Sequence, residues 1–411
     1  MSGTFNQNLR ARHVQGSRWK AAFALSTILA IAFLATLVLT IVDDAFGWVI
    51  MMDETDRREL ARDGVALDVQ NASQLLATID EHLSPRRYRA LERELPFAER
   101  TRDDLYAVVL AEIVKPEIAE TFTLFDSLFS AARIKAQATA DYPEGTLLFR
   151  SWVNVRFLLA PQSAVPLAAG IKTAILGTLM TIFITLAFAF PVGIGAAIWL
   201  EEYAKDGWLT RAIQVNIYNL AGVPSIIYGM LGLAIFVRGM EPITSGAAFG
   251  ASTGGDVSNG RTILSAGLTL AVLILPVIII NAQEALRAVP GTLRQSSLAV
   301  GATKWQTIRH HVLPASFDRI LTGTVLAVSR AIGETAPLVV IGASTFLTQD
   351  PSSIFSKFTT LPIQIYQWTS RPQAEFRHLA AAAIVVLLAL MLSLNSFAIV
   401  ARNKMRKQKR F

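Results

Sequence analysis

The sequence predicts an all-α, polytopic membrane protein with six transmembrane helices and a mainly helical insert outside the cytoplasm. Of the 411 residues, 52% are apolar and only 17% are charged, and the mean hydropathy is +0.43. Soluble domains are nearer a quarter charged. The apolar residues fall in long blocks with basic residues beside them, whereas nucleic-acid binding would spread basic and aromatic residues over one folded face. We therefore expect contact with membrane lipid and no nucleic acid.

Six apolar blocks are long enough to cross a membrane as helices. Crossing takes about 20 mainly apolar residues, because each backbone polar group must find its partner within the segment. The first block exceeds the about 7 to 15 apolar residues of a signal peptide, and no small-residue cleavage site follows it, so we expect a retained anchor. The six blocks are Ala21–Val42, Ala174–Leu200, Asn219–Val237, Ile263–Ile280, Ile320–Ile341 and Leu379–Val400.

The positions of the basic residues predict the orientation. Many of the Lys and Arg residues lie before the first block, after the last block and in the loop between the fourth and fifth blocks. Basic flanks mark the cytoplasmic side of a membrane protein. Six spans place both termini on one side, so we expect both termini and this loop in the cytoplasm.

The chain is expected to have four regions. Residues 1–50 hold the cytoplasmic amino-terminal segment and the first span, and residues 51–165 form the extracytoplasmic insert. Residues 166–402 form the main transmembrane domain, and residues 403–411 form a basic cytoplasmic tail. The residues of the insert do not indicate its role.

Apolar spacing predicts short helices in the insert. One follows a cap at Ser73, a second follows Ser84, and a third begins at Thr101. Asp103 and Asp104 are interpreted as acids at this helix start rather than as a catalytic carboxylate pair. A further apolar face is formed by Phe122, Phe125 and Phe129.

The sequence contains no recognisable catalytic pattern. Without cysteine, the chain has no disulfide, no Cys-ligated zinc and no thiol nucleophile. Its five histidines are one adjacent pair, His310 and His311, and three isolated residues. No G-x-x-x-x-G-K-[ST] phosphate loop occurs, so we expect no catalytic residue, no metal, no cofactor and no ATP bound by this chain.

The loop after the fourth block carries the most informative motif, QSSLAVGATKWQTIRHHVLP, from Gln295 to Pro314. A short helix can end at Gly301, because glycine is favoured just past a helix end, and a second can begin near Thr303. Pro314 is expected to limit that second helix. Two short helices joined at a glycine form a rigid projection suited to a groove on a cytoplasmic partner. The alternative is an ordinary basic loop.

The spacing of this motif resembles the EAA loop of binding-protein-dependent ABC importer permeases, in which a glycine follows Glu-Ala-Ala and Leu-Pro closes the segment. The family's frequent Glu-Ala-Ala is replaced here by Gln-Ser-Ser, which keeps hydrogen-bonding capacity without the charge, and His311 stands where Ile is frequent. The resemblance implies that the loop, within residues 284–318, docks on an ATPase through Gln295, Ser296, Ser297, Gly301, Leu313 and Pro314.

Two further motifs are similar to those of the phosphate permeases in this family. They are LAGVPSIIYGMLGL, from Leu220 to Leu233, and SRAIGETAPLV, from Ser329 to Val339, whose Ala-Pro favours the PstA type over the PstC type. The resemblance covers Ala168 to Val400 and implies the ABC importer permease fold in the bacterial cell inner (plasma) membrane. It also implies ATP-driven phosphate uptake through a pathway shared with a PstC-like permease, with two PstB-like ATPase subunits that bind ATP and a PstS-like phosphate-binding protein.

Arg330 and Glu334 lie in the middle of the fifth block, four residues apart and therefore on one helix face. Charges deep in a membrane are costly, so they usually face a bundle interior and mark a pathway. We assign Arg330, Glu334 and the adjoining Thr335 to the substrate pathway, since a guanidinium suits transient contact with phosphate. The alternative is a structural salt bridge.

Three prolines within the blocks are expected to bend helices or to gate the pathway. A proline frees backbone groups, which is tolerated in a membrane where neighbours or a water-filled cavity take them up. Simple packing is the alternative, because proline is frequent in membrane helices. The prolines are Pro224, Pro276 and Pro337, and Lys172 at the start of the second block is interpreted as a snorkelling lysine.

Other functions stay open on the residues alone. One is a permease for another oxyanion, such as sulfate or molybdate. A second is a stand-alone ion-coupled transporter, which would not need a docking loop. A third is a membrane-anchored sensor whose insert binds a ligand. Co-purification with a stoichiometric ATPase would favour a permease over the last two.

Overall fold

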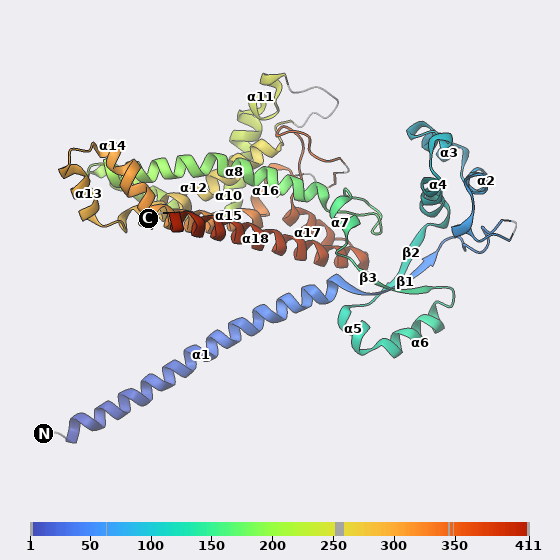
Figure 1. The fold of residues 1–411 in the computed structure, drawn as a ribbon, viewed down its shortest axis with the longest axis horizontal. Coiled ribbons are helices and arrows are strands. Elements are labelled where there is room, and N and C mark those ends of the chain that lie inside the picture. Colours follow the sequence, from blue (N-terminus) through green and yellow to red (C-terminus); the bar gives the residue numbers. More distant parts are fainter. Residues whose placement is uncertain (1–2, 63, 251–258, 344–345, 348, 409–411) are drawn as a thin grey trace. The chain divides into compact units, whose positions relative to one another are not determined.

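The computed structural model describes residues 3–62, 64–250, 259–343, 346–347 and 349–408. The chain forms two compact units, residues 1–152 and 153–411. The first unit contains α1 (Gly3–Ala45) and most of the insert, and the second contains the other spans (Figure 1). Residues 409–411 of the expected basic tail lie outside the described residues.

Within the described residues, five helices are long and apolar enough to cross a membrane, and one bent helix pair is a sixth candidate. Each of these stretches overlaps one of the six expected blocks, so the predicted class of a mostly helical polytopic protein is confirmed. The five helical stretches are Arg12–Ala45, Lys172–Tyr203, Ile263–Arg287, Lys304–Gly333 and Ala374–Lys404. The main elements of the last four are α8 (Lys172–Ile198), the π-helical turn η4 (Trp199–Tyr203), α12 (Ile263–Arg287), α15 (Leu313–Gly333) and α18 (Ala374–Gln408).

The third block is bent rather than straight. α9 (Trp208–Ala221) ends before Pro224, and α10 (Ser225–Gly232) continues into the π-helical turn η5 (Leu233–Gly239) after a bend of 104°. The hydroxyl of Tyr228, on α10, donates to the carbonyl of Leu220, on α9, at 2.8 Å and so holds the bend. The bend lies at Pro224, which was expected to bend its helix: this proline caps α10 and has no N–H with which to extend α9.

The fifth block is interrupted near its end. α15 ends at Gly333, Glu334 has extended backbone geometry, and the short helix α16 (Ala336–Ile341) follows. The expectation that Arg330 and Glu334 lie in the middle of one helix is therefore wrong. Arg330 occupies the last turn of α15, and Glu334 is the residue at which this helix stops.

Pro314 does not stop the second loop helix. α14 (Lys304–Thr307) passes through the π-helical turn η7 (Ile308–Val312) into α15, so residues 304–333 form one helix. Pro314 lies in the first turn of α15, directly after η7. A π-helical turn shifts the backbone hydrogen bonds by one residue, and we attribute the tolerance of Pro314 to this local change.

α12 is the centre of the second unit. α8 and α15 pack on α12, and α18 packs on α15 (Figure 1). The approach of α8 is close at Gly267, where a Cβ atom would lie 2.6 Å from Ile184. Pro276 is buried within α12, which continues through it as one helix. The remaining elements are α7 (Val155–Leu159), α11 (Glu241–Thr244), η6 (Ala247–Phe249), α13 (Gly291–Ala299) and α17 (Leu361–Thr369).

Lys172 has an ionic partner at the start of α8. Its Nζ atom lies 2.6 Å from Oδ2 of Asp350, and the Thr173 hydroxyl donates to Oδ1 of the same carboxylate at 2.9 Å. The Lys172 contact, with help from Thr173, lowers the pKa of Asp350. Lys172 therefore ties α8 to the loop before α17. The interpretation of Lys172 as a snorkelling lysine does not include this ionic partner.

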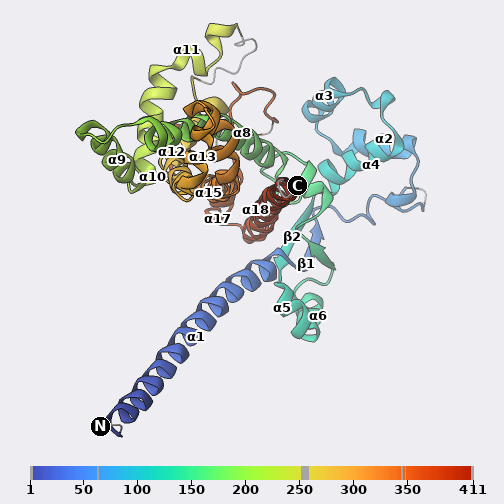
Figure 2. The ribbon, with the colours of Figure 1, turned by 60° about the vertical axis from the view of Figure 1, so that its left-hand side comes forward.

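The insert contains a three-stranded antiparallel sheet that the sequence analysis does not predict. β1 (Phe46–Asp53) follows α1 directly and lies between β2 (Pro116–Thr121) and β3 (Thr146–Ser151). The helices α2 (Ala72–His82), α3 (Pro85–Glu94) and α4 (Arg102–Val109) lie on one side of the strands, and α5 (Leu124–Phe129) and α6 (Ala131–Asp141) on the other (Figure 2). The short turns are η1 (Leu67–Val69), η2 (Phe97–Glu99) and the π-helical η3 (Leu110–Val114).

Two of the three expected helix starts in the insert are confirmed. Ser84 caps α3, and Thr101 caps α4 in a capping box with Asp104. The hydrogen bonds from Thr101 lower the pKa of Asp104, as expected of an acid at a helix start. The prediction of a cap at Ser73 is wrong. Asn71 caps α2: its side chain accepts from the backbone N–H of Gln74, and the Gln74 side chain accepts from the backbone N–H of Asn71.

Candidate functional site

The loop between α12 and α15 contains two short helices that meet at a turn and form a projection. α13 ends before Gly301, which has a φ of +87°, and α14 begins after a cap at Thr303. This left-handed conformation favours glycine, so the expected helix stop is confirmed. Ser297 is buried, and its hydroxyl lies 2.9 Å from that of Thr307, so this hydrogen bond joins α13 to the helix that follows.

The tip of this projection is apolar and exposed. Val300 is 84% exposed, and Leu298 and Trp305 are each at least half exposed on either side of Gly301. Gln295 and Ser296 are exposed as well, whereas Ser297 faces inward. The sequence analysis missed Leu298, Val300 and Trp305 as docking candidates. Their signal was three large apolar residues placed within five positions of a glycine in a loop predicted to be cytoplasmic.

A buried ion pair fixes α13 to the second span. Nη2 of Arg294, on α13, lies 2.9 Å from Oε1 of Glu202, in η4, and the two side chains are 24% and 8% exposed. The same guanidinium donates to the carbonyls of Val289 and Leu286, just after and within the last turn of α12, at 2.8 and 2.9 Å. We call Arg294, Glu202 and these two carbonyls the loop clamp. It ties the projection to α8 and α12 at once.

A second polar network lies beside the loop clamp and is more exposed. Arg287 donates to both carboxylate oxygens of Glu201 at 2.8 and 2.6 Å, and Gln283 donates to Glu201 at 3.0 Å. Neither network was found from the sequence. The available signal was an acidic pair directly after the second block and arginines at the end of the fourth block and in the loop after it.

The three proposed pathway residues meet at the interruption between α15 and α16. Nε of Arg330 lies 3.4 Å from Oε1 of Glu334, and Thr335 follows at the start of α16. The Arg330 side chain is 44% exposed and is close enough to Tyr228 for electrostatic interaction. Among the described residues, we find no second hydrogen bond of this guanidinium.

Two of the three prolines flank helix interruptions that lie close to each other. Pro224 precedes α10, and Pro337 occupies the first turn of α16. These two short helices pack together so closely that a Cβ atom at Gly229 would lie 2.6 Å from Cα of Pro337. Irregular backbone at membrane depth is tolerated where it is buried in protein or lines a water-filled cavity. Pro276 lies apart from this arrangement, in the middle of α12.

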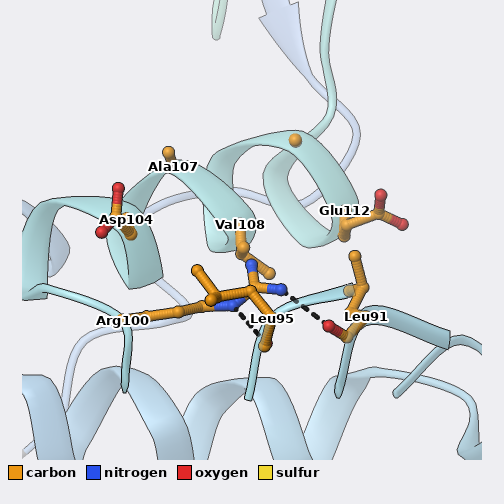
Figure 3. Close-up of a pocket in the computed structure, with 8 residues that line it drawn as sticks. Leu91, Leu95, Arg100, Asp104, Ala107, Val108 and Glu112 are labelled. Carbon is orange, nitrogen blue, oxygen red and sulfur yellow. Dashed lines mark hydrogen bonds between the residues drawn. The ribbon is translucent and has the colours of Figure 1, made fainter. Parts of the chain in front are cut away.

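The insert has a shallow hollow of about 430 Å³ beside α4 (Figure 3). Its charged groups already have partners within the insert. Arg100 donates to the carbonyls of Leu91 and Leu95, Asp104 caps α4, and Glu112 lies 2.6 Å from Arg87. A ligand site needs polar groups directed at the ligand, so we assign none here. The lining residues are Leu91, Leu95, Arg100, Asp104, Ala107, Val108, Ala111 and Glu112.

Comparison with known proteins decides the family. Residues 189–407 match the family described as "Binding-protein-dependent transport system inner membrane component", and they include the loop clamp, the projecting loop and both interrupted spans. The chain belongs to this family. It is therefore an inner membrane transport component, and the predicted resemblance is confirmed.

Several curated proteins are similar to more than half of this chain. "Probable ABC transporter permease protein YqgI" of Bacillus subtilis is 30% identical over 59% of this chain and 82% of its own length. The phosphate transport system permease protein PstC of Haemophilus influenzae is 33% identical over 53% of this chain and 72% of its own length. The phosphate transport system permease protein PstA of Xylella fastidiosa is 31% identical over 57% of this chain and 76% of its own length.

Proposed function

We propose that this chain is the permease subunit of an ATP-driven ABC importer, and that it forms a pathway for inorganic phosphate together with a second, PstC-like permease. The projecting loop carries this proposal. Its apolar tip, Leu298, Val300 and Trp305, is presented on a frame that the loop clamp fixes to two spans. A rigid projection of this kind suits a groove on an ATPase.

The remaining components follow from the same proposal. The sequence has no phosphate loop, so ATP is bound and hydrolysed by two PstB-like ATPase subunits, and this chain holds no cofactor. A PstS-like receptor delivers phosphate from outside. Both termini and the projecting loop lie in the cytoplasm, in agreement with their basic residues. The residues Gln295, Ser296, Gly301, Leu313 and Pro314 shape or flank the docking surface, and Ser297 supports it from within.

Phosphate is proposed as the substrate on two grounds. Relatives of both the PstA and the PstC type are named phosphate permeases, and the Ala-Pro of the fifth block favours PstA. In addition, Arg330 offers a planar set of N–H donors, which matches a tetrahedral oxyanion. Glu334 and Thr335 adjoin this guanidinium, and the bends at Pro224 and Pro337 are proposed as the points about which the pathway opens. Pro276 is proposed as a third such point.

Uptake and co-purification test this proposal together. The chain, produced with its partner subunits in cells that lack other phosphate transporters, is expected to support uptake of radiolabelled phosphate and to purify with a stoichiometric ATPase. A large excess of sulfate or molybdate should leave phosphate uptake nearly unchanged. Strong competition by either anion would instead indicate another oxyanion permease. Uptake without an associated ATPase would indicate a stand-alone transporter.

The glycine at the bend of the docking loop gives a sharper test. Gly301→Asp is expected to lower ATPase retention and phosphate uptake several-fold, because an L-residue at φ +87° costs about 1 kcal/mol and would change the angle of the loop. Gly291→Asp is the matched control: its Cβ also meets open space, but its φ is not positive. The protein level in the membrane should stay the same in both variants.

Equal ATPase retention in the Gly301 and Gly291 variants would remove the bend from the docking mechanism. An ATPase that uses cellular ATP lies in the cytoplasm. A selective loss in the Gly301 variant would therefore also support the proposed cytoplasmic side of this loop.

A further inference from the structure

The short helix α5 turns its apolar face away from the protein. Phe125, Leu128 and Phe129 are 63%, 66% and 73% exposed, and the two phenylalanine rings lie with their centroids 4.4 Å apart. These positions, i, i+3 and i+4, share one helix face. The inward residue is instead the small polar Ser127, which is buried. This orientation is the reverse of that expected for a helix packed on a water-soluble domain.

Three contacts hold α5 at the junction between α1 and β1. The backbone N–H of Phe125 donates to Oδ1 of Asp43 at 2.5 Å, and the backbone N–H of Trp48 donates to the Ser127 hydroxyl at 2.9 Å. Gly47 lies against the carbonyl of Phe122, where a Cβ atom would be only 1.9 Å away. The orientation of the apolar face is therefore set by the end of the first span.

The depth of α5 in the membrane follows from this attachment. α1 carries the first candidate span, Arg12–Ala45, and its apolar block ends at Val42. Asp43 follows directly, and a carboxylate at this position belongs at the edge of the hydrocarbon layer. α5 is bonded to Asp43 and lies beside the end of α1 (Figure 2). This attachment places α5 at the depth expected of the lipid headgroups.

We propose that α5 is an interfacial membrane anchor, in which Phe125, Leu128 and Phe129 insert into the leaflet where α1 ends. Aromatic and large aliphatic side chains at headgroup depth bind the boundary between headgroups and acyl chains. Arg133, on the neighbouring α6, lies 3.7 Å from Asp126 and adds a basic group beside this face. The anchor holds the base of the insert on the bilayer, whatever the chain transports.

Lipid contact can be measured in the full-length protein because the chain contains no cysteine. Leu128→Cys and the control Asp103→Cys, at an exposed position on α4, are each labelled with an environment-sensitive fluorophore and reconstituted in phosphatidylcholine–phosphatidylglycerol nanodiscs. The ratio of quenching by spin-labelled phosphatidylcholine to quenching by aqueous iodide is expected to be at least about three-fold higher at position 128. Adding Phe125→Ser and Phe129→Ser to the Leu128→Cys protein should lower that ratio.

Equal ratios at positions 128 and 103 would overturn the proposal, since the α5 face would then lie in water. Protection of position 128 from both quenchers would overturn it too, because protein rather than lipid would cover the face. All the substituted side chains are exposed, so the variants are expected to fold. Circular dichroism and elution of the nanodisc complex check this directly.

Discussion

Replacing Arg330 with Gln is expected to abolish phosphate uptake at unchanged membrane abundance. The contact between Arg330 and Glu334 is long, at 3.4 Å, and the guanidinium is 44% exposed, so Glu334 does not occupy the whole of this guanidinium. We therefore propose that the positive charge of Arg330 binds the phosphate anion. Arg330→Lys should keep part of the uptake, because lysine retains the charge but not the planar pair of donors. Uptake of radiolabelled phosphate, normalised to the amount of protein in the membrane, measures the activity of both variants.

The Arg330→Gln, Glu334→Gln double variant separates the pathway role from a structural one. Arg330 lies in the last turn of α15, where a positive charge also complements the helix dipole. If Arg330 only neutralises Glu334 or this dipole, the double variant should transport phosphate almost normally. If Arg330 meets the anion, the double variant should be as inactive as Arg330→Gln alone. Near-normal uptake would make the pair structural.

Removing the negative charge of the loop clamp is expected to destabilise the protein strongly. Glu202 is 8% exposed and Arg294 is 24% exposed, so Glu202→Gln leaves a largely buried guanidinium without its counter-charge. Breaking a buried pair in this way costs about 3 to 5 kcal/mol, and somewhat less here because Arg294 keeps two carbonyl acceptors. We expect a clear fall in the thermal unfolding midpoint in detergent and a several-fold loss of ATPase retention.

The neighbouring pair provides a matched control for the loop clamp. Glu201→Gln leaves Arg287 without its counter-charge, but Arg287 is 54% exposed, so this change should cost about 1 kcal/mol or less although the contact is short. The double variant Glu202→Gln, Arg294→Gln should recover much of the stability, because no buried charge is left unpaired. A Glu202→Gln protein that melts like the Glu201→Gln protein would show that the loop clamp does not fix the loop.

The ends of the helices show how much could be predicted from local sequence. Gly301, Ser84 and Thr101 act where their own conformational or hydrogen-bonding preferences place them. Pro314 was misjudged because the effect of a proline depends on the turn before it, and a π-helical turn leaves no mark in apolar spacing. Pro224 was expected to bend its helix, but the size of the bend depends on the packing of α10 against α16.

The sequence alone determined the membrane class, the six apolar blocks, the family resemblance and the place of the docking loop, because hydropathy, charge and motif spacing are properties of short segments. Only the tertiary structure decided which side chains meet. The Arg294–Glu202 contact joins residues 92 positions apart, and the bond between Asp43 and Phe125 joins residues 82 positions apart. The sheet likewise pairs Val49 with Thr121 and Leu148. Contacts across such separations depend on how helices and strands pack, and no local periodicity records them.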